Sequence, residues 1–390
     1  MIIKKYKMHE FLVLICMFLI TLENHGDFRL YISIVLIITA YIIKKHDKIS
    51  KTIISSGLIF IMILSLMSLL AAFDFLTYKS NMLNYGVGSF YVSNILKICL
   101  ALLVINIIFN DKQAQVKIIK GLVILHLVAF YTQFIFVYTT GYYIDLLFPF
   151  TGEASRYTWQ VTVPLIGQTY RPTGFYNEPS TYSAFILCII LIRNLITERF
   201  DKLDAAAIFS LFASLSFASI IYGGLFLLII NLRGSRVLKY LPLILFFIVV
   251  MSPTMIDMLE ARTSGDYDAI GLRAGLFQVI MSQSYTEILW GSGPIGVPNE
   301  IEFLVNNANV SWAKNGLPAL NDNGLFIFII MKFGVLGCIL LLLYMKKHLH
   351  DISVFLLHTI ILMTKIKYTS AIFIIYIILL SLRKSMKDNE

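Results

Sequence analysis

The sequence predicts an all-α, polytopic integral membrane protein, and three observations support that fold class. Hydrophobic residues make up 58% of the chain and charged residues only 14%, whereas about a quarter of a soluble domain is charged. Apolar runs close to the roughly 20 residues that cross a hydrocarbon core as a helix recur from one end to the other. The basic residues gather in short segments between these runs. We therefore expect one membrane domain over residues 1–390, a bundle of about twelve transmembrane helices.

The apolar runs give the expected order of the spans. The first run follows Lys4, Lys5 and Lys7, the charge order of a secretory signal peptide. No small-residue cleavage site follows it, so we expect it to remain as a first span. The expected spans lie near residues 9–23, 28–43, 52–73, 90–109, 118–138, 180–195, 204–231, 238–255, 323–344, 350–364 and 367–382.

The seventh run, residues 204–231, is long for one crossing, and three serines interrupt it. Short basic segments of membrane proteins collect on the cytoplasmic side. Such segments flank this run at residues 193–202 and 233–239. Both are cytoplasmic only if the run enters and leaves the membrane by the same face. We therefore expect two short helices with a break near residues 216–219.

The complete scheme places the N- and C-termini on the cytoplasmic side and two large loops outside. These loops are residues 139–179 and 257–321. Loops longer than about 15 residues inside a compact domain are usually functional. Lys365 and Lys367 also fall outside, against the charge rule. We expect the chemistry of the protein on this outer face.

The second outer loop is expected to carry an amphipathic helix that lies on the membrane surface. Its apolar residues Leu272, Leu276, Val279 and Ile280 repeat at helical spacing within residues 271–289. Such a helix places its apolar face in the lipid and its polar face among the head groups.

Composition indicates neither a metal or cofactor site nor nucleic-acid binding. The net charge of +9 comes from lysines and arginines beside the spans, where membrane topology explains it. Disulfides are not expected, because the cysteines lie far apart inside apolar segments and suit small buried positions. These cysteines are Cys16, Cys99, Cys188 and Cys338.

The first outer loop ends with an arginine, a glycine and a carboxylate just before a span. These residues are Arg171, Gly174 and Glu178, and Pro179 follows them. Pro179 suits the first turn of a helix, where its missing N–H is not needed. A helix N-terminus attracts anions, and Arg171 beside it would strengthen an anion site. A snorkelling arginine and a turn at the membrane interface are the structural alternative.

The second outer loop carries two further polar segments. Arg273 flanks the apolar face of the expected surface helix. Gly291 and Gly293 form a small-residue turn where backbone can approach a ligand closely. Asn321 and Asp322 then open the ninth apolar run, at the outer mouth of the bundle. Solvated loop charges, a packing turn and an Asx helix cap are the structural alternatives.

In this order and on one face, these motifs resemble those of the Wzy-type O-antigen and capsular polysaccharide polymerases and of the related O-antigen ligases. The resemblance covers roughly residues 85–345 and includes the serine-broken helix pair. Many relatives carry a histidine where the third motif begins, and Asn321 and Asp322 stand there in this sequence, which favours a polymerase over a ligase. The matching residues are Arg171, Gly174, Phe175, Glu178 and Pro179, then Arg273 with Gly291 and Gly293, then Gly334 and Gly337.

The resemblance implies a metal-independent, inverting glycosyltransferase of the bacterial plasma membrane. It would move a growing glycan from undecaprenyl pyrophosphate onto another lipid-linked repeat unit, on the periplasmic or extracellular face. Arg171 and Arg273 would clamp the pyrophosphate leaving group, and Glu178 or Asp322 would act as general base. A chain-length regulator and a flippase would be partners, besides membrane lipid and the lipid-linked donor and acceptor. Residues expected to contact substrate are Gly174, Tyr176, Asn177, Arg156, Gly291, Gly293 and Asn321.

Two other function classes stay open. A lipid-linked oligosaccharide flippase or transporter would also have many helices, but such proteins usually line a central cavity with charge and often have repeated halves. Here the spans are nearly free of charge, and the arginines lie in two outer loops. A sensor or structural membrane protein would not need paired polar loops.

Overall fold

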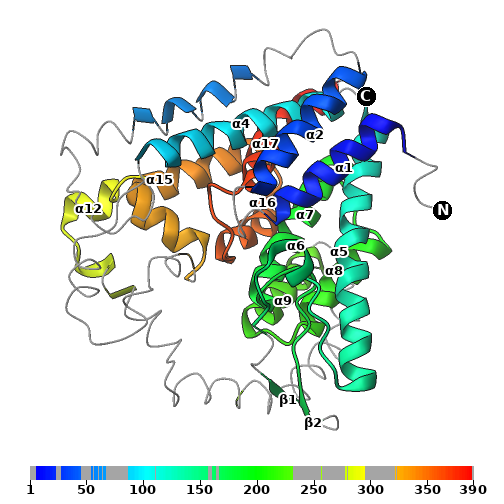
Figure 1. The fold of residues 1–390 in the computed structure, drawn as a ribbon. Coiled ribbons are helices and arrows are strands. Elements are labelled where there is room, and N and C mark those ends of the chain that lie inside the picture. The colour runs from blue at the N-terminus through cyan, green and yellow to red at the C-terminus, as the bar shows by residue number, and fades with distance from the viewer. Residues whose placement is uncertain are drawn as a thin grey trace.

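In the computed structural model, the described residues form helices and one two-stranded hairpin (Figure 1). The expected spans at residues 52–73 and 238–255 lie wholly or partly outside the described residues, and so do the candidate residues Arg273 and Asp322. The structure describes residues 6–22, 28–44, 54–55, 57–59, 61–63, 65–66, 87–109, 111–156, 160–163, 167–231, 256, 277–278, 280–294, 321 and 323–388.

Within the described residues, 4 helices are long and apolar enough to cross a membrane. Together with several shorter apolar helices they indicate a multi-pass helical membrane protein, as the sequence predicts, although twelve crossings are not shown by this part of the chain. The long helices are α4 (Val87–Phe109), α5 (Lys112–Thr140), α7 (Pro179–Thr197) and α15 (Leu325–His348). The shorter ones include α1 (Met8–Thr21), α9 (Phe217–Asn231), α16 (Ile352–Thr359) with the 3₁₀ helix η4 (Ile360–Met363), and α17 (Ala371–Asp388).

Helix α2 (Phe28–Lys44) shows that large apolar side chains cover the outside of the bundle as well as its core. Phe28, Val35 and Ile42 recur every seven residues and are 73%, 63% and 67% exposed. Extended apolar surface of this kind marks contact with a membrane rather than with water. The stripe on α2 therefore agrees with a helix that faces lipid.

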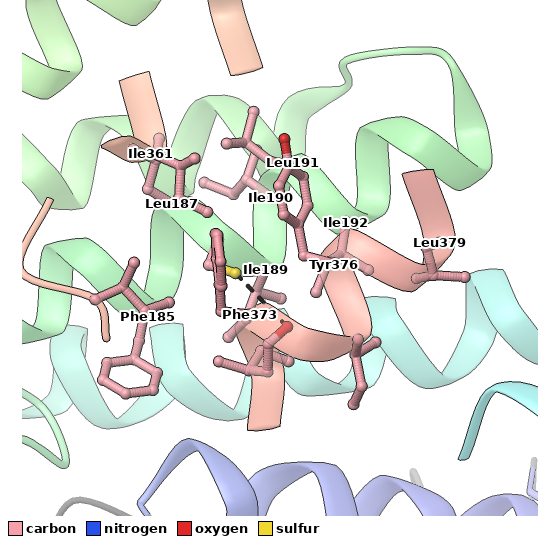
Figure 2. Packing of buried hydrophobic residues seen from close by; sticks show 14 of the residues in the cluster. Phe185, Leu187, Ile189, Ile190, Leu191, Ile192, Ile361, Phe373, Tyr376 and Leu379 are labelled. Carbon is pink, nitrogen blue, oxygen red and sulfur yellow. Dashed lines mark hydrogen bonds between the residues drawn. The ribbon is translucent and has the colours of Figure 1, made fainter. Parts of the chain in front are cut away.

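Helix α7 forms the centre of the bundle. It is apolar around its whole circumference, which is typical of a helix buried on all sides. It contacts α5, α17, α9 and α8 (Lys202–Ala213). Figure 2 shows its residues Leu187–Ile192 among side chains of η4 and α17, including Ile361, Phe373 and Tyr376. Because α7 is fixed from several directions, the residues at its first turn have a defined position.

The remaining described helices pack around this centre. α1 lies against α2, α2 against α4, and α4 against α17, and these helices run side by side across the top of Figure 1. Helix α5 contacts α1, α7 and α8. Its ends follow local chemistry, because the Asp111 carboxylate accepts a hydrogen bond from the N–H of Ala114 and Gly141 ends the helix at a φ of 71°.

The predicted split of residues 204–231 into two helices is confirmed, but the break lies at residues 214–216, slightly before the expected 216–219, because α8 ends at Ala213 and α9 begins at Phe217. The chain reverses at Leu215, whose φ of 51° is unusual for a residue other than glycine. Hydroxyl groups hold the break against the first turn of α7. The Tyr182 hydroxyl bonds Ser210 Oγ at 2.6 Å, and Ser183 Oγ bonds Ser219 Oγ. The break therefore lies at the end of the bundle where α7 begins, which we call the Pro179 end.

The segment between α5 and α7 contains two elements that the sequence did not predict. Helix α6 (Phe148–Thr151) is followed by an antiparallel hairpin of β1 (Val161–Val163) and β2 (Gly167–Thr169). The hairpin projects from the Pro179 end in Figure 1. The segment is therefore folded rather than an irregular loop.

Residues 364–370, which we call the connector, join η4 to α17. The two apolar segments before and after it match the spans expected at residues 350–364 and 367–382. The Tyr222 hydroxyl of α9 donates to the carbonyl oxygen of Met363 at 2.7 Å. The connector is thereby held near the serine-lined break.

Candidate functional site

Helix α7 begins as the sequence predicts, with Pro179 in its first turn and Glu178 as the N-cap residue in an extended conformation. The Glu178 carboxylate turns toward two cations instead of capping the helix. One oxygen lies 3.1 Å from Lys365 Nζ, and the other pairs with the guanidinium of Arg156. Ser180 Oγ also donates to Glu178, at 3.2 Å. Glu178 is therefore the centre of an ionic cluster at the Pro179 end.

The ionisation of Glu178 follows from these neighbours. Burial by itself would raise the pKa of its carboxyl group, but Lys365 and Arg156 outweigh that effect and lower the pKa from 4.5 to about 2. A carboxylate with so low a pKa is a weak proton acceptor at neutral pH. The geometry thus favours a role for Glu178 in holding cations over the role of general base.

The loop before Glu178 is shaped by one buried amide, that of Gln133 on α5. Its Oε1 accepts hydrogen bonds from the backbone N–H of Thr173 at 2.6 Å and of Gly174 at 2.9 Å. Its Nε2 donates to the carbonyl oxygen of Ile144 at 2.7 Å. Gly174 adopts a φ of 60°, where glycine is favoured. Arg171 lies in the same loop and is only 9% exposed.

Asn177 and Arg156 lie beside Glu178. The N–H of Arg156 donates to the carbonyl oxygen of Asn177 at 2.8 Å, and Asn177 Nδ2 donates to Glu153 Oε1 at 3.1 Å. The Arg156 side chain is 62% exposed. Arg156, which the resemblance gave as a substrate contact, is thus held at the start of α7.

Tyr176 differs from its predicted role as a substrate contact. It is 1% exposed and lies between two stacked rings, His126 at 5.6 Å and Phe185 at 5.1 Å between ring centroids. A large aromatic ring gains most from complete burial, and the core of α5 and α7 provides it. In this structure Tyr176 packs the loop onto the bundle.

The connector is the place where the other two motifs meet Glu178. Asn321 Nδ2 donates to the carbonyl oxygen of Lys365 at 2.6 Å. The N–H of Leu325, the first residue of α15, donates to the carbonyl oxygen of Thr364 at 2.7 Å. The Tyr368 hydroxyl donates to the carbonyl oxygen of Pro294 at 2.9 Å. Segments far apart in the sequence therefore converge on one short connector.

We call this arrangement the connector junction, and Lys365, Tyr368 and Pro294 are the residues in it that the sequence did not predict for the site. In the sequence, Lys365 only contradicts the expected topology, because basic residues usually lie on the cytoplasmic side and the scheme places this lysine outside. A lysine between two apolar segments is itself a signal, because charge near the membrane interior is costly and marks function more often than elsewhere. The connector junction comprises Arg156, Glu178, Pro294, Asn321, Lys365 and Tyr368.

Gly291 approaches another backbone closely, but that backbone belongs to α15 and not to a ligand. A Cβ atom added to Gly291 would lie 2.4 Å from the backbone nitrogen of Gly334. Gly334 breaks the helical conformation of α15 with a φ of 67° and a ψ of −178°. The break frees the carbonyl oxygen of Met331, which accepts a hydrogen bond from the N–H of Ser292 at 2.9 Å. The turn that contains Gly291 and Gly293 therefore docks into a kink.

Two local expectations differ from the structure at helix starts. The N-cap of α15 is Gly324, with a φ of 92°, and not an Asx residue. Glycine suits this position because an added Cβ would lie 2.7 Å from the carbonyl oxygen of Met363. A new helix, α12 (Tyr285–Trp290), begins within the expected surface helix, because Ser284 and Glu287 form a capping box there. The residues of that surface helix before 277 lie outside the described part.

A cavity of about 310 Å³ lies at the opposite end of α7 from Glu178. Its walls include Asn194, Glu198 and Asp351, and an ion pair of 2.9 Å joins Glu198 to Arg383 there. None of the residues predicted from the motifs lines this cavity. We therefore place the candidate site at the connector junction and not in the cavity.

Comparisons of the chain with protein-family models, with curated proteins and with solved structures give no match. The motif resemblance therefore stays a prediction. The geometry of the connector junction carries the functional argument.

Proposed function

We propose that this chain is a membrane glycosyltransferase that extends a polysaccharide. It transfers a growing glycan from undecaprenyl pyrophosphate onto a lipid-linked repeat unit, on the outer face of a bacterial plasma membrane. In this proposal the N- and C-termini are cytoplasmic and the Pro179 end faces outward. The observation that carries the proposal is the convergence of Glu178, Arg156 and Lys365 with the third motif at the start of a central helix.

The charge balance of the connector junction suits a pyrophosphate leaving group. Arg156 and Lys365 both pair with the Glu178 carboxylate, so two cations lie at the start of α7. Arg171 belongs to the same loop as Glu178, and Arg273 is proposed to join it from the second loop. Cations placed where a leaving group becomes anionic stabilise the transition state for breaking the glycosidic bond. This chemistry needs cations at the Pro179 end.

In this mechanism Glu178 positions cations and Asp322 takes the proton of the acceptor hydroxyl. The low pKa of Glu178 supports the first assignment, because both of its oxygens are engaged by cations. The second rests on the order of the motifs, since Asn321 next to Asp322 bonds the connector. Arg171 and Arg273 remain the proposed clamp. No step requires a metal ion or an organic cofactor.

A lipid-linked oligosaccharide flippase is the second candidate, and one observation favours it. Lys332 lies within α15 and is only 3% exposed, with its ammonium 5.7 Å from the centroid of the Phe328 ring. Buried charge within a span is typical of transport pathways. The experiment below separates the two candidates.

The test is the ladder pattern of surface polysaccharide in cells that lack the chain and in cells that express it again. Wild-type protein should restore long chains to cells that otherwise show single repeat units. At equal expression, Arg171→Ala and Arg273→Ala should each fail to restore long chains. Arg171→Lys should also restore few of them, because an ammonium cannot donate the two parallel hydrogen bonds of a planar guanidinium. Arg199→Ala is the matched control, because Arg199 is exposed beyond the opposite end of α7.

Three results would count against the proposal. Full ladders with Arg171→Ala at normal expression would show that Arg171 is not needed to bind the pyrophosphate leaving group. Loss of all surface glycan, single units included, from cells without the chain would favour the flippase. Chains of normal length that fail to reach their lipid anchor would favour an O-antigen ligase.

A further inference from the structure

We propose that Lys365 is a diphosphate-binding residue of this site, with Glu178 as the residue that positions it. The inference rests on the proposed function and deepens it, because it adds a cation that the motifs do not contain. The ligand is the diphosphate of a polyprenyl-linked substrate. Three features support it: the rigidity of the connector, the two cations around Glu178 and the burial of the ammonium.

The connector holds Lys365 on a fixed backbone. Its carbonyl oxygen accepts the hydrogen bond from Asn321 Nδ2, and the preceding carbonyl, that of Thr364, accepts one from Leu325. Three residues later, the Tyr368 hydroxyl binds the turn at Pro294. Tyr368 also contacts the rings of Phe328 and Phe333, with centroids 5.4 and 5.0 Å away. A lysine held in this way is arranged before any ligand arrives, which lowers the entropic cost of binding.

The Glu178 carboxylate gathers two cations at the start of α7. One carboxylate faces two cations, and of the two Lys365 is the more buried, with its side chain 11% exposed against 62% for Arg156. A diphosphate that approaches the start of α7 would meet both of these cations. The Arg156 side chain, being exposed, can move while the connector keeps Lys365 in place.

Partial burial strengthens the electrostatic attraction between the Lys365 ammonium and an anionic ligand. Ionic attraction is several times stronger in a partly desolvated site than in water. Glu178 offsets the cost of holding the ammonium there, and its own side chain is only 22% exposed. Lys365 belongs to an element that contacts the first, second and third motifs. A ligand bound to Lys365 would therefore lie where the three motifs meet.

The experiment uses full-length protein in lipid nanodiscs and measures binding of undecaprenyl diphosphate directly. Lys365→Gln should lower the affinity by about tenfold or more, the loss expected for one charge-assisted hydrogen bond. Lys365→Arg should retain most of the affinity, because it keeps the charge. Lys367→Gln is the matched control, since it makes the same charge change two residues away in the same connector. Equal affinity of wild type and Lys365→Gln would overturn the inference.

A second measurement on the wild-type protein covers the case in which Lys365→Gln fails to fold. Undecaprenyl diphosphate should protect Lys365, but not Lys367, from an amine-acylating reagent, as read by mass spectrometry. Equal acylation of Lys365 with and without the diphosphate would overturn the inference. For the positioning role, Glu178→Gln should raise the KM for the donor more than it lowers kcat, whereas a purely structural defect would lower the amount of active protein.

The two proposals fail in different ways. Wild-type protein that binds the diphosphate through Lys365 but restores no ladder would overturn the polymerase function and leave the lysine assignment standing. Restored ladders together with unchanged diphosphate binding in Lys365→Gln would overturn the lysine assignment alone.

Discussion

At the scale of single residues, buried polar groups decide the shape of the candidate site. The sequence predicted Pro179 in the first turn of a helix, because proline is favoured there for local reasons. It did not predict Gln133 or Lys365, since each lies within or beside an apolar stretch and its partner is far away in the chain. A side chain whose partner is remote in sequence leaves no local pattern.

Replacing Gln133 with leucine should destabilise the loop that contains Arg171. The substitution leaves the buried N–H groups of Thr173 and Gly174 without their acceptor, and each unsatisfied group costs about 1–3 kcal/mol. We expect a lower thermal unfolding temperature in detergent and shorter glycans in cells. Gln113→Leu is the control, because Gln113 is exposed on the same helix. Equal losses in both variants would show that the amide has no special role.

The ion pairs of Glu178 should make stability depend on acidic pH. The folded pKa of about 2 lies below the ordinary value of 4.5, so the pairs contribute fully above pH 4.5. Their contribution is lost as the pH falls from 4.5 toward 2. Wild type should therefore melt at a higher temperature than Glu178→Gln at pH 7, and the difference should shrink through this window. A difference that stays constant from pH 7 to pH 3 would contradict the assigned pKa.

At the scale of elements, helix boundaries were more predictable than helix shape. The start of α7 and the split between α8 and α9 follow from proline and from interrupting serines. The kink in α15 was not predicted, because Gly334 lies in a strongly apolar run that indicates an uninterrupted span. The docking of Gly291 against that kink is a property of the pair, and neither glycine alone indicates it.

Substitution of either glycine of the kink should disrupt the packing of α12 against α15. A Cβ at Gly334 would lie 2.0 Å from the carbonyl oxygen of Leu289, and one at Gly291 would meet the α15 backbone. Gly334→Ala and Gly291→Ala should each lower the folded yield strongly, by size-exclusion profile and thermal unfolding. Gly224→Ala should be neutral or stabilise α9 by up to about 1 kcal/mol, because nothing lies within 4 Å of its added methyl group. Normal folding of Gly334→Ala would show that α15 can straighten.

At the scale of the whole molecule, hydrophobic composition predicted the class of protein correctly and left its path through the membrane open. Periodicity and length identify helices that suit a bilayer. They do not determine how deep in the membrane short helices such as α8 and α9 lie, because that depends on their packing against α7. The number of crossings and their direction stay predictions.

Cysteine labelling should determine which end of the helix bundle faces the outside of the cell. In a variant that lacks the native cysteines, Gln160→Cys should react with an impermeant maleimide on intact cells, because Gln160 is exposed at the Pro179 end. Lys347→Cys, near the exposed end of α15, should react only after the membrane is permeabilised. The opposite pattern would invert the proposed topology.

The separation of Glu178 and Lys365 in the chain has a consequence for biogenesis. Lys365 is the 187th residue that the ribosome adds after Glu178, which takes about 10 to 40 seconds at the usual rate of roughly 5–20 residues per second. Throughout that interval Glu178 has been synthesised while its lysine partner has not. The ionic cluster is therefore completed only after nearly the whole protein has left the ribosome, so an interrupted translation product cannot assemble it.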